Sequence, residues 1–441
     1  MKTLYYHATL ITGDVDRLLL PGGYLLVDGN RVAAVGTAPD SELPAADVRH
    51  DLAGRILMPG MISSHCHFYG QFVRGISLSQ PIYNWQQYLS RMWWRVDKAL
   101  DERQTYYSAM MGLVEGLKLG TTTYFDHQAS PNYISGSLDT IEKAMREVGG
   151  RGCLAYEVTD RDGTERAKRG IAENERYIRA HQTPGERFRG IFGLHASYSL
   201  SEETLAESSA VGNALNSGFH IHMAESEADV SDCYRRFDMH VVERLQQAGI
   251  LGEKTITAHN VHLKPRHFGI LRDAGVTAAH NVQSNTNTAV GICPVVPLMD
   301  AGVHVALGGD GYTYDLFTEL GFASIQQHIG QNDPSVFSGR QILDMAFTNN
   351  QRLAKNIFGY EVGVLRPGAA ADFLILDYDP PTPLNAGNVL SHMTSGFSGR
   401  VETVVCDGET VVSQHRCTRV DEKEIFANCR AEAQRLWDGL A

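Results

Sequence analysis

The stretch Pro59-Gly-Met-Ile-Ser-Ser-His65-Cys-His67-Phe-Tyr-Gly70 decides how this 441-residue chain is interpreted. Its apolar start predicts a β-strand, and alternate residues of a strand share a face, so His65 and His67 point to the same side. Two imidazoles on one face are what a zinc-type metal takes from two of its ligands. The pair alone also fits two ordinary histidines at a buried strand end, because the chain has 18 histidines and a second such pair at His220 and His222.

The composition is that of a globular protein, with 43% hydrophobic and 20% charged residues. A net charge of -12 and the absence of a basic run argue against nucleic-acid binding. No apolar run approaches the roughly 18 to 20 residues of a membrane span, and the first residues do not resemble a signal peptide. Seven scattered cysteines predict free thiols in a reducing compartment. We therefore expect a cytoplasmic protein, without membrane or nucleic-acid partners, that binds a small molecule and forms a homodimer.

Both ends of the chain are rich in short strands broken by glycine turns. Asp28-Gly29-Asn30 between two apolar runs predicts a tight hairpin. Similar strands return after residue 364, and the last twenty residues predict a helix. These patterns predict a composite β-sandwich domain with a C-terminal helix, formed by 1–58 plus 364–441.

The middle of the chain, 59–363, alternates short apolar runs with amphipathic helical stretches, which is typical of repeated βα units. The predicted strands are the run ending at His67, then 121–125, 152–156, 191–195, 219–222, 255–259, 277–280 and 303–307. The predicted helices are 102–119, 138–148, 166–180, 202–215, 233–248 and 338–357. Eight strands are the number that a TIM-type (β/α)8 barrel requires, so the predicted fold class is α/β.

Polar residues able to bind a metal or move a proton lie at the ends of many of these strands. They are His65, His67, His195, His222, His259, His280 and Asp310. The carboxyl ends of barrel strands meet at one rim, where such barrels keep their active sites. The sequence therefore predicts that these side chains come together, with His220 one layer deeper in the barrel than His222.

These stretches resemble the metal-dependent amidohydrolase superfamily, in particular its branch of aromatic aminohydrolases that includes S-adenosylhomocysteine deaminases and triazine hydrolases. The similar motifs are the opening stretch, Gly193-Leu-His-Ala-Ser-Tyr198, His220-Ile-His-Met-Ala-Glu225, Ala258-His-Asn-Val-His262, His280-Asn-Val-Gln-Ser-Asn285 and Leu307-Gly-Gly-Asp-Gly311. Within that branch, Asp126-His-Gln-Ala-Ser-Pro-Asn132 and the run from Tyr156 to Gly163 most resemble the aminohydrolases called SsnA. The resemblance covers nearly the whole chain.

The resemblance implies that one divalent metal, Zn²⁺ or Fe²⁺, is held by His65, His67, His222 and Asp310. Three neutral imidazoles and one carboxylate leave the metal with net positive charge, which lowers the pKa of a bound water toward about 7. Two-metal relatives use a carboxylated lysine at the fourth strand, and no lysine lies between Lys168 and Lys254. A single metal is therefore expected.

Further roles also follow from the resemblance. Glu225, His259 and Asp310 are the predicted catalytic residues, with Glu225 carrying the proton from the metal-bound water to the substrate ring. The predicted substrate contacts are His195, Trp94, Asp97 and Gln71. The implied function is metal-dependent hydrolysis of a C–N bond in a nitrogen heterocycle, with deamination of a purine-, pterin- or triazine-like ring as the leading hypothesis and ring opening of a cyclic amide or amidine as the alternative. A barrel that only binds a ligand is disfavoured, because the three predicted catalytic residues are all present.

Overall fold

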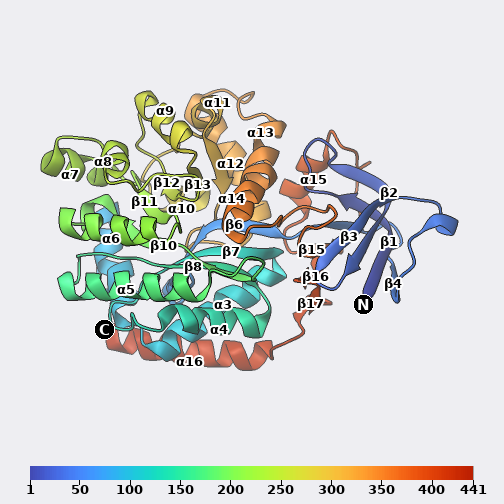
Figure 1. Ribbon diagram of the computed structural model, residues 1–441, viewed down its shortest axis with the longest axis horizontal. Coiled ribbons are helices and arrows are strands. Elements are labelled where there is room, and N and C mark those ends of the chain that lie inside the picture. Colours follow the sequence, from blue (N-terminus) through green and yellow to red (C-terminus); the bar gives the residue numbers. More distant parts are fainter. Residues whose placement is uncertain (441) are drawn as a thin grey trace.

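Eight parallel strands form a barrel in the computed structural model, which describes residues 1–440 (Figure 1). Their bounds are β6 Met61–Cys66, β7 Thr121–Gln128, β8 Arg151–Tyr156, β10 Phe192–Ala196, β11 Phe219–Met223, β12 Ile256–His259, β13 Thr277–His280 and β14 His304–Leu307. A short strand, β9 (Phe188–Gly190), pairs with β8 and leads into β10. Each predicted strand coincides with one of the eight, and the predicted α/β barrel is confirmed.

Two parallel sheets, β6 to β9 and β10 to β14, are joined at both seams to close the barrel. A parallel bridge between Val158 and Leu194 links the β8 side to β10, and another between Cys66 and Asp310 links β6 to the end of β14. At the second seam the Asp310 amide donates to the His65 carbonyl at 3.0 Å. This closure brings the first and the last strand of the barrel side by side.

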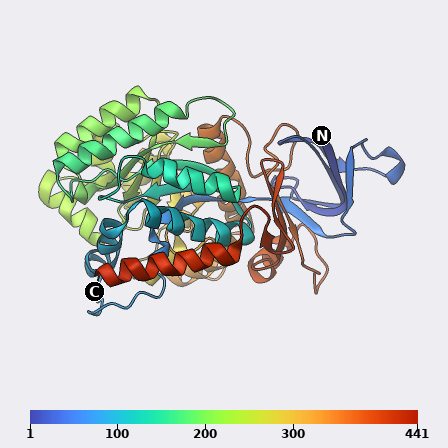
Figure 2. The same ribbon diagram turned by 90° about the horizontal axis from the view of Figure 1, so that it is seen from below.

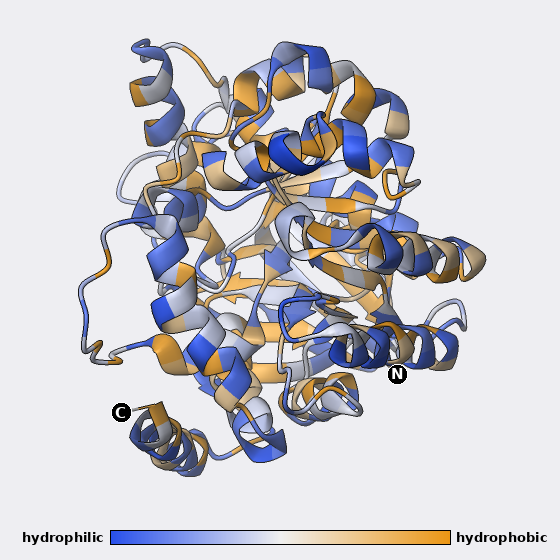
Figure 3. Cartoon of the chain, turned by 90° about the vertical axis from the view of Figure 1, so that its left-hand side faces the viewer, coloured by the Kyte–Doolittle hydropathy of each residue, from blue (hydrophilic) through white to orange (hydrophobic). Residues whose placement is uncertain are grey.

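A ring of helices surrounds the strands, and Figure 3 looks onto this ring. The helices after β6 are α1 Trp85–Tyr88, α2 Trp94–Ala99, α3 Glu102–Lys118, α4 Ser137–Val148, α5 Thr164–Ala180, α6 Glu202–Ala214, α7 Glu227–Phe237, α8 Val241–Gln247, α9 Pro265–Ala274, α10 Val282–Asn287, α11 Val295–Asp300, α12 Leu316–Gln331, α13 Gly339–Leu343 and α14 Asn349–Phe358. A π-helical turn, Leu89–Trp93, joins α1 to α2.

The prediction of one helix over 233–248 is wrong. Asp238 adopts a left-handed backbone with φ 53°, which ends α7, and the His240 side chain accepts from the Val242 amide to start α8.

Strands from both ends of the chain form one nine-stranded sheet beside the barrel (Figure 2). They are β1 Lys2–Ile11, β2 Leu19–Asp28, β3 Arg31–Thr37, β4 Val48–Asp51, β5 Ile56–Pro59, β15 Phe373–Leu376, β16 Val401–Cys406, β17 Glu409–Ser413 and β18 Arg416–Cys417. Antiparallel pairing of β5 with β15 joins the two halves, and strands of both halves share one hydrophobic cluster. Gly29, with φ 59°, makes the predicted β2–β3 turn. Helix α15 (Val389–Gly396) precedes β16, and α16 (Glu422–Leu440) packs against α2 and α3 of the barrel.

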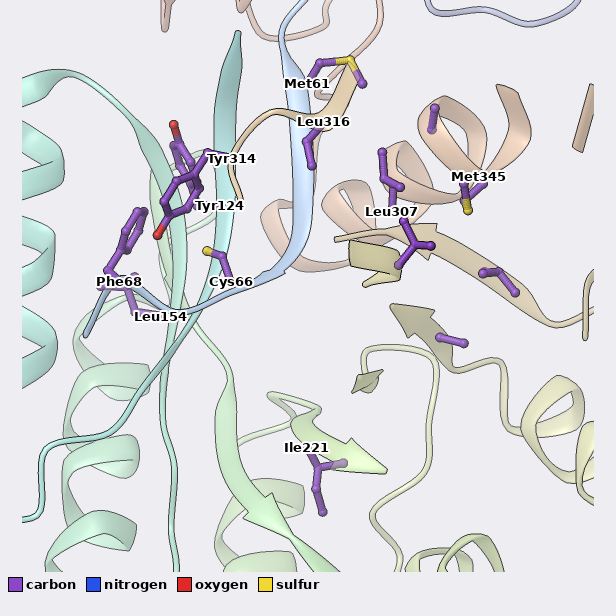
Figure 4. Close-up of a cluster of buried hydrophobic side chains, with 14 of the residues drawn as sticks. Met61, Cys66, Phe68, Tyr124, Leu154, Ile221, Leu307, Tyr314, Leu316 and Met345 are labelled. Carbon is purple, nitrogen blue, oxygen red and sulfur yellow. The ribbon is translucent and has the colours of Figure 1, made fainter. Parts of the chain in front are cut away.

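The residue between the two histidines at the end of β6 is buried in the main hydrophobic core. Cys66, which points away from the two histidines, belongs to the same cluster as Phe68, Tyr124 and Tyr314 (Figure 4). The Phe68 and Tyr314 rings stack with centroids 5.5 Å apart. This packing fixes the strand, so that the alternating histidines are held toward the barrel interior.

Two further predictions concern the whole chain. Across residues 1–440, no helix is long and apolar enough to cross a membrane. All seven cysteines are free, as the scattered spacing predicted.

Candidate active site

The four predicted metal ligands lie together at the carboxyl end of the barrel. His67 Nε2 is 3.1 Å from both His222 Nε2 and Asp310 Oδ1. His65 Nε2 is 3.4 Å from the same Asp310 oxygen. Residues far apart in the chain thus point their donor atoms at one place, because the carboxyl ends of β6, β11 and β14 meet at one rim of the barrel.

Backbone carbonyls hold two of these imidazoles in a defined tautomer. His67 Nδ1 donates to the His127 carbonyl at 2.6 Å, and His222 Nδ1 donates to the His195 carbonyl at 2.8 Å. In the neutral imidazole, with the proton on Nδ1, the Nε2 atom of each ring has a lone pair directed into the site. This is the arrangement that metal-ligating histidines usually have.

His65 is held by a different partner. Its Nδ1 lies 2.8 Å from His220 Nε2, and the His220 ring stacks on His127 at 4.3 Å. His220 is thus a supporting residue one layer deeper in the barrel, as the sequence predicted. The Nε2 of His65 is buried and has no hydrogen-bond partner among residues 1–440, so it is free to bind a cation.

The chemistry of this donor set fits a divalent transition metal. Burial lowers the pKa of His65 to about 3 and that of His222 well below its usual value, which keeps both rings neutral with available lone pairs. Burial also opposes a charge on His67, but the Asp310 carboxylate more than offsets it and raises the His67 pKa to about 9. The Asp310 carboxylate thus attracts positive charge to this place. Three imidazole nitrogens and one carboxylate oxygen are ligands that zinc and iron both accept.

The three predicted catalytic residues lie beside this cluster. His259 Nε2 is 3.9 Å from Glu225 Oε2 and 3.9 Å from Asp310 Oδ2. The other His259 nitrogen is 2.8 Å from the Asn285 side-chain oxygen, which sets the ring orientation. His259 and Asp310 have left-handed backbones with φ of 74° and 55°. Such strained conformations are frequent at functional sites, where surrounding contacts stabilise them.

The Glu225 side chain is 15% exposed and has one well-defined hydrogen bond. Its Oε1 accepts from the Trp85 indole nitrogen at 2.8 Å. Burial raises the pKa of Glu225 above its ordinary value, and the Trp85 bond opposes that shift. A carboxyl with a raised pKa is suited to taking up and releasing a proton near neutral pH.

A cavity of about 60 Å³ opens onto this cluster. Its lining includes three of the four predicted substrate contacts, namely Trp94, Asp97 and His195. A water molecule needs about 10 to 15 Å³ of such volume, so the cavity has room for a few waters. Residues 85 to 99 cover part of this cavity and contribute Tyr88, Leu89, Trp93, Trp94 and Asp97 to its lining.

Gln71 is not among the residues that line this cavity. Its amide donates to the His67 carbonyl at 3.0 Å and to the Tyr314 hydroxyl at 2.9 Å. The short helical segment Phe68–Val73 directs this side chain behind the histidines. The position of Gln71 therefore does not support its prediction as a substrate contact.

Two charged residues of the cavity wall escaped the sequence analysis. Glu157 directly follows β8, and Arg161 lies four residues later, in a loop. Arg161 Nη2 pairs with Asp97 Oδ2 at 2.6 Å, so Asp97 already has a cationic partner. Glu157 is 2% exposed, and burial raises its pKa to about 8. The signal that could have found Glu157 is the one used for the histidines, a polar residue at the end of a barrel strand.

The Amidohydrolase family model matches residues 56–411 of the chain. A 5'-deoxyadenosine deaminase from Methanothermobacter thermautotrophicus is 31% identical over 97% of this chain and 98% of its own length. A 5-methylthioadenosine/S-adenosylhomocysteine deaminase from Desulfitobacterium hafniense is 29% identical over 98% of this chain and 97% of its own.

Solved structures show the same fold. An adenosine deaminase from Xanthomonas campestris with bound zinc superposes with a TM-score of 0.87 at 21% identity, covering 98% of each chain. The atrazine chlorohydrolase TrzN from Arthrobacter aurescens, complexed with zinc, gives 0.83 at 22% identity, covering 98% of this chain and all of its own. With the matched model and the relatives over nearly full length, this chain belongs to the amidohydrolase family and is a hydrolase acting on C–N bonds.

Proposed function

We propose that this enzyme removes an exocyclic amino group from a nitrogen heterocycle and releases ammonia. The observation that carries the proposal is the position of Glu225 and His259 beside the cluster of His65, His67, His222 and Asp310. The curated relatives are deaminases by name, and they match over nearly the whole chain.

The four clustered residues would hold one divalent metal, for which zinc is the leading candidate because two structural relatives contain it. When bound, such a metal lowers the pKa of a coordinated water enough to make it a nucleophile at neutral pH. Asp310 is the carboxylate at the cluster, and it accepts the proton that the water loses. His259, oriented by Asn285, polarises the carbon under attack.

Glu225 completes the proton transfer. Its carboxyl lies 3.9 Å from His259 and lines the cavity, so it is placed to exchange a proton with the substrate. It first protonates the ring nitrogen next to the reacting carbon, and proton transfer to the amino group then makes ammonia the leaving group.

An ammonia assay over a panel of purines, pterins and triazines tests this function on the zinc-loaded protein. Release of ammonia in proportion to the spectral change of the ring supports deamination. Loss of the ultraviolet band without ammonia would instead indicate ring opening, and no turnover of any nitrogen heterocycle would refute both.

We also propose that two copies form a homodimer through α12. Phe322, Ile325 and Ile329 lie on one face of this helix and are 44%, 59% and 75% exposed. No Asp, Glu, Lys or Arg occurs from residue 320 to 331, so the stripe offers no charge for an oppositely charged partner. A second copy brings the same uncharged stripe, which suits two-fold pairing.

Sedimentation analysis tests this assembly. Ile325→Glu places a charge in the centre of the stripe and is expected to yield monomers, whereas Tyr234→Glu, at an exposed residue on α7, should leave the dimer intact. A monomeric wild-type protein would refute the proposal.

The reducing cytoplasm remains the proposed location. The seven free cysteines support it, and fluorescence microscopy of a tagged chain in its own cell would test it.

A further inference from the structure

We infer that Ser284 is a positioning residue for Asp310, which holds one oxygen of that carboxylate beside His259 and leaves the other oxygen to the metal. Ser284 is neither one of the proposed ligands nor part of the proposed proton transfer. This inference rests on the proposed function, because it concerns the same ligand cluster.

The two carboxylate oxygens of Asp310 have different surroundings. Oδ1 lies 3.1 Å from His67 Nε2 and accepts from the Gly311 amide at 2.7 Å. Oδ2 accepts from the Ser284 hydroxyl at 2.5 Å and lies 3.9 Å from His259 Nε2, which is too far for a hydrogen bond. Oδ1 is therefore the oxygen that faces the proposed ligands, whereas Oδ2 is held on the side of His259.

The position of the second oxygen matters for a catalytic metal. The torsion that turns a carboxylate about its Cβ–Cγ bond is broad, and a carboxylate can present one or both oxygens to a cation. Within residues 1–440, the Ser284 hydroxyl is the hydrogen-bond donor to Oδ2 of Asp310. A metal that takes up both oxygens loses the open position that catalytic sites keep for water or substrate.

Helix α10 holds the Ser284 side chain in place. Ser284 is 7% exposed. The preceding residue, Gln283, donates from its backbone and from its side-chain amide to Glu319 of α12, at 3.1 and 2.6 Å. The following residue, Asn285, lies 2.8 Å from the His259 ring nitrogen that it orients. Two consecutive residues of α10 therefore orient two neighbouring groups of the site.

A direct contact with the substrate is the alternative role, because Ser284 lines the cavity. A serine hydroxyl has one proton, and Ser284 gives that proton to Asp310 Oδ2. The hydroxyl therefore cannot donate to a substrate while this bond exists. The positioning role predicts that loss of the hydroxyl lowers kcat at nearly unchanged KM, whereas a substrate contact predicts a higher KM.

The visible absorption spectrum of the cobalt-loaded protein tests the inference without a substrate, because it reports the ligands around Co²⁺. Ser284→Ala leaves Oδ2 free to turn toward the cation and should change the position and intensity of the bands. Ser284→Thr keeps the hydroxyl and should give the wild-type spectrum. Ser209→Ala is the matched control and should also give that spectrum, because Ser209 donates to the Ala248 carbonyl at 2.5 Å and does not line the cavity.

Steady-state rates, measured with a heterocycle from the panel that is turned over, complete the test. Residues that orient metal ligands typically contribute about 10- to 100-fold, so kcat of Ser284→Ala should fall by that factor while KM stays nearly constant. Ser284→Thr should recover most of the rate. An unchanged cobalt spectrum in Ser284→Ala, or a higher KM in place of a lower kcat, would overturn the inference.

The cobalt spectrum also separates this inference from the proposed function. If Ser284→Ala changes the spectrum but no nitrogen heterocycle releases ammonia, the inference stands and the deaminase proposal fails. If ammonia is released and Ser284→Ala changes neither the spectrum nor kcat, the deaminase proposal stands and the inference fails.

Discussion

The indole nitrogen of Trp85 donates a 2.8 Å hydrogen bond to the carboxyl of Glu225. Trp85 begins α1, in the segment that covers the cavity, whereas Glu225 follows β11 of the barrel. The segment that covers part of the cavity is therefore linked to the proposed proton carrier through one hydrogen bond. Because the N–H stabilises the ionised carboxylate, it lowers the pKa of Glu225 against the raising effect of burial.

Replacing Trp85 with Phe should shift the pH dependence of the reaction. Without the donor, the pKa of Glu225 rises, so the protonated form that donates to the ring nitrogen persists to a higher pH. The basic limb of kcat/KM should therefore move up by about one pH unit. A pH profile of steady-state rates measures this shift.

Trp437→Phe is the matched control, because that indole donates to the Phe72 carbonyl at 2.8 Å and does not line the cavity. Its pH profile should equal that of the wild type. An unchanged profile in Trp85→Phe would show that the indole does not tune Glu225.

Glu225→Gln should retain the metal and lose most activity. The amide fills the same volume but carries no exchangeable carboxyl proton, and general acid–base groups typically contribute about 10² to 10⁴ in rate. Ammonia release under single-turnover conditions measures the loss, and elemental analysis gives the zinc content. Activity within a few-fold of wild type would remove Glu225 from the proposed proton transfer.

Much of the fold could be predicted from the sequence because strand signals and strand ends are local. Short apolar runs, many of them ending in His, mark the barrel strands, and all eight coincide with observed strands. The break between α7 and α8 depends on the left-handed backbone of Asp238. Aspartate adopts this conformation only occasionally, so nothing in the sequence marks this residue as the end of a helix.

The site was predictable to a lesser extent. His65, His67, His222 and Asp310 stand at strand ends, and the barrel geometry brings them together. Gln71 was predicted to contact the substrate. The direction of its side chain is set by the short helical segment Phe68–Val73, which the sequence pattern does not specify. Glu157 was missed because a glutamate is usually a solvent-exposed residue.

Removing the metal should abolish activity and lower the melting temperature. A group that binds only the folded state stabilises it by an amount that grows with its concentration relative to its dissociation constant. Dialysis against a chelator, followed by zinc or ferrous iron, measures both effects and identifies the metal that restores activity.

His222→Ala should bind little zinc, whereas His392→Asn, on α15, should bind as much as the wild type. Equal zinc content in all three proteins would refute the proposed ligand set.

A fully buried ion pair links the barrel to the terminal sheet. Arg151, on β8, binds Asp372 through two bonds of 2.7 and 3.1 Å, and it also reaches Asp407 at 3.0 Å. Arg151 and Asp372 are both 0% exposed. Arg151→Met leaves the buried Asp372 without its cation and should lower the free energy of unfolding by about 3 to 5 kcal/mol, measured in urea.

This linkage also tests the predicted division between 59–363 and the two terminal segments. If the terminal sheet is a separate unit, Arg151→Met should split the unfolding transition, because the ion pair between Arg151 and Asp372 joins the two units. The matched control is Arg179→Met, which removes an ion pair with Glu175 whose partners are 61% and 37% exposed and should change the free energy of unfolding by less than about 1 kcal/mol. Replacing both Arg151 and Asp372 with apolar residues should recover much of the stability, since the penalty arises from the unpaired charge. A double variant as unstable as the single one would show that the ion pair itself holds the two parts together.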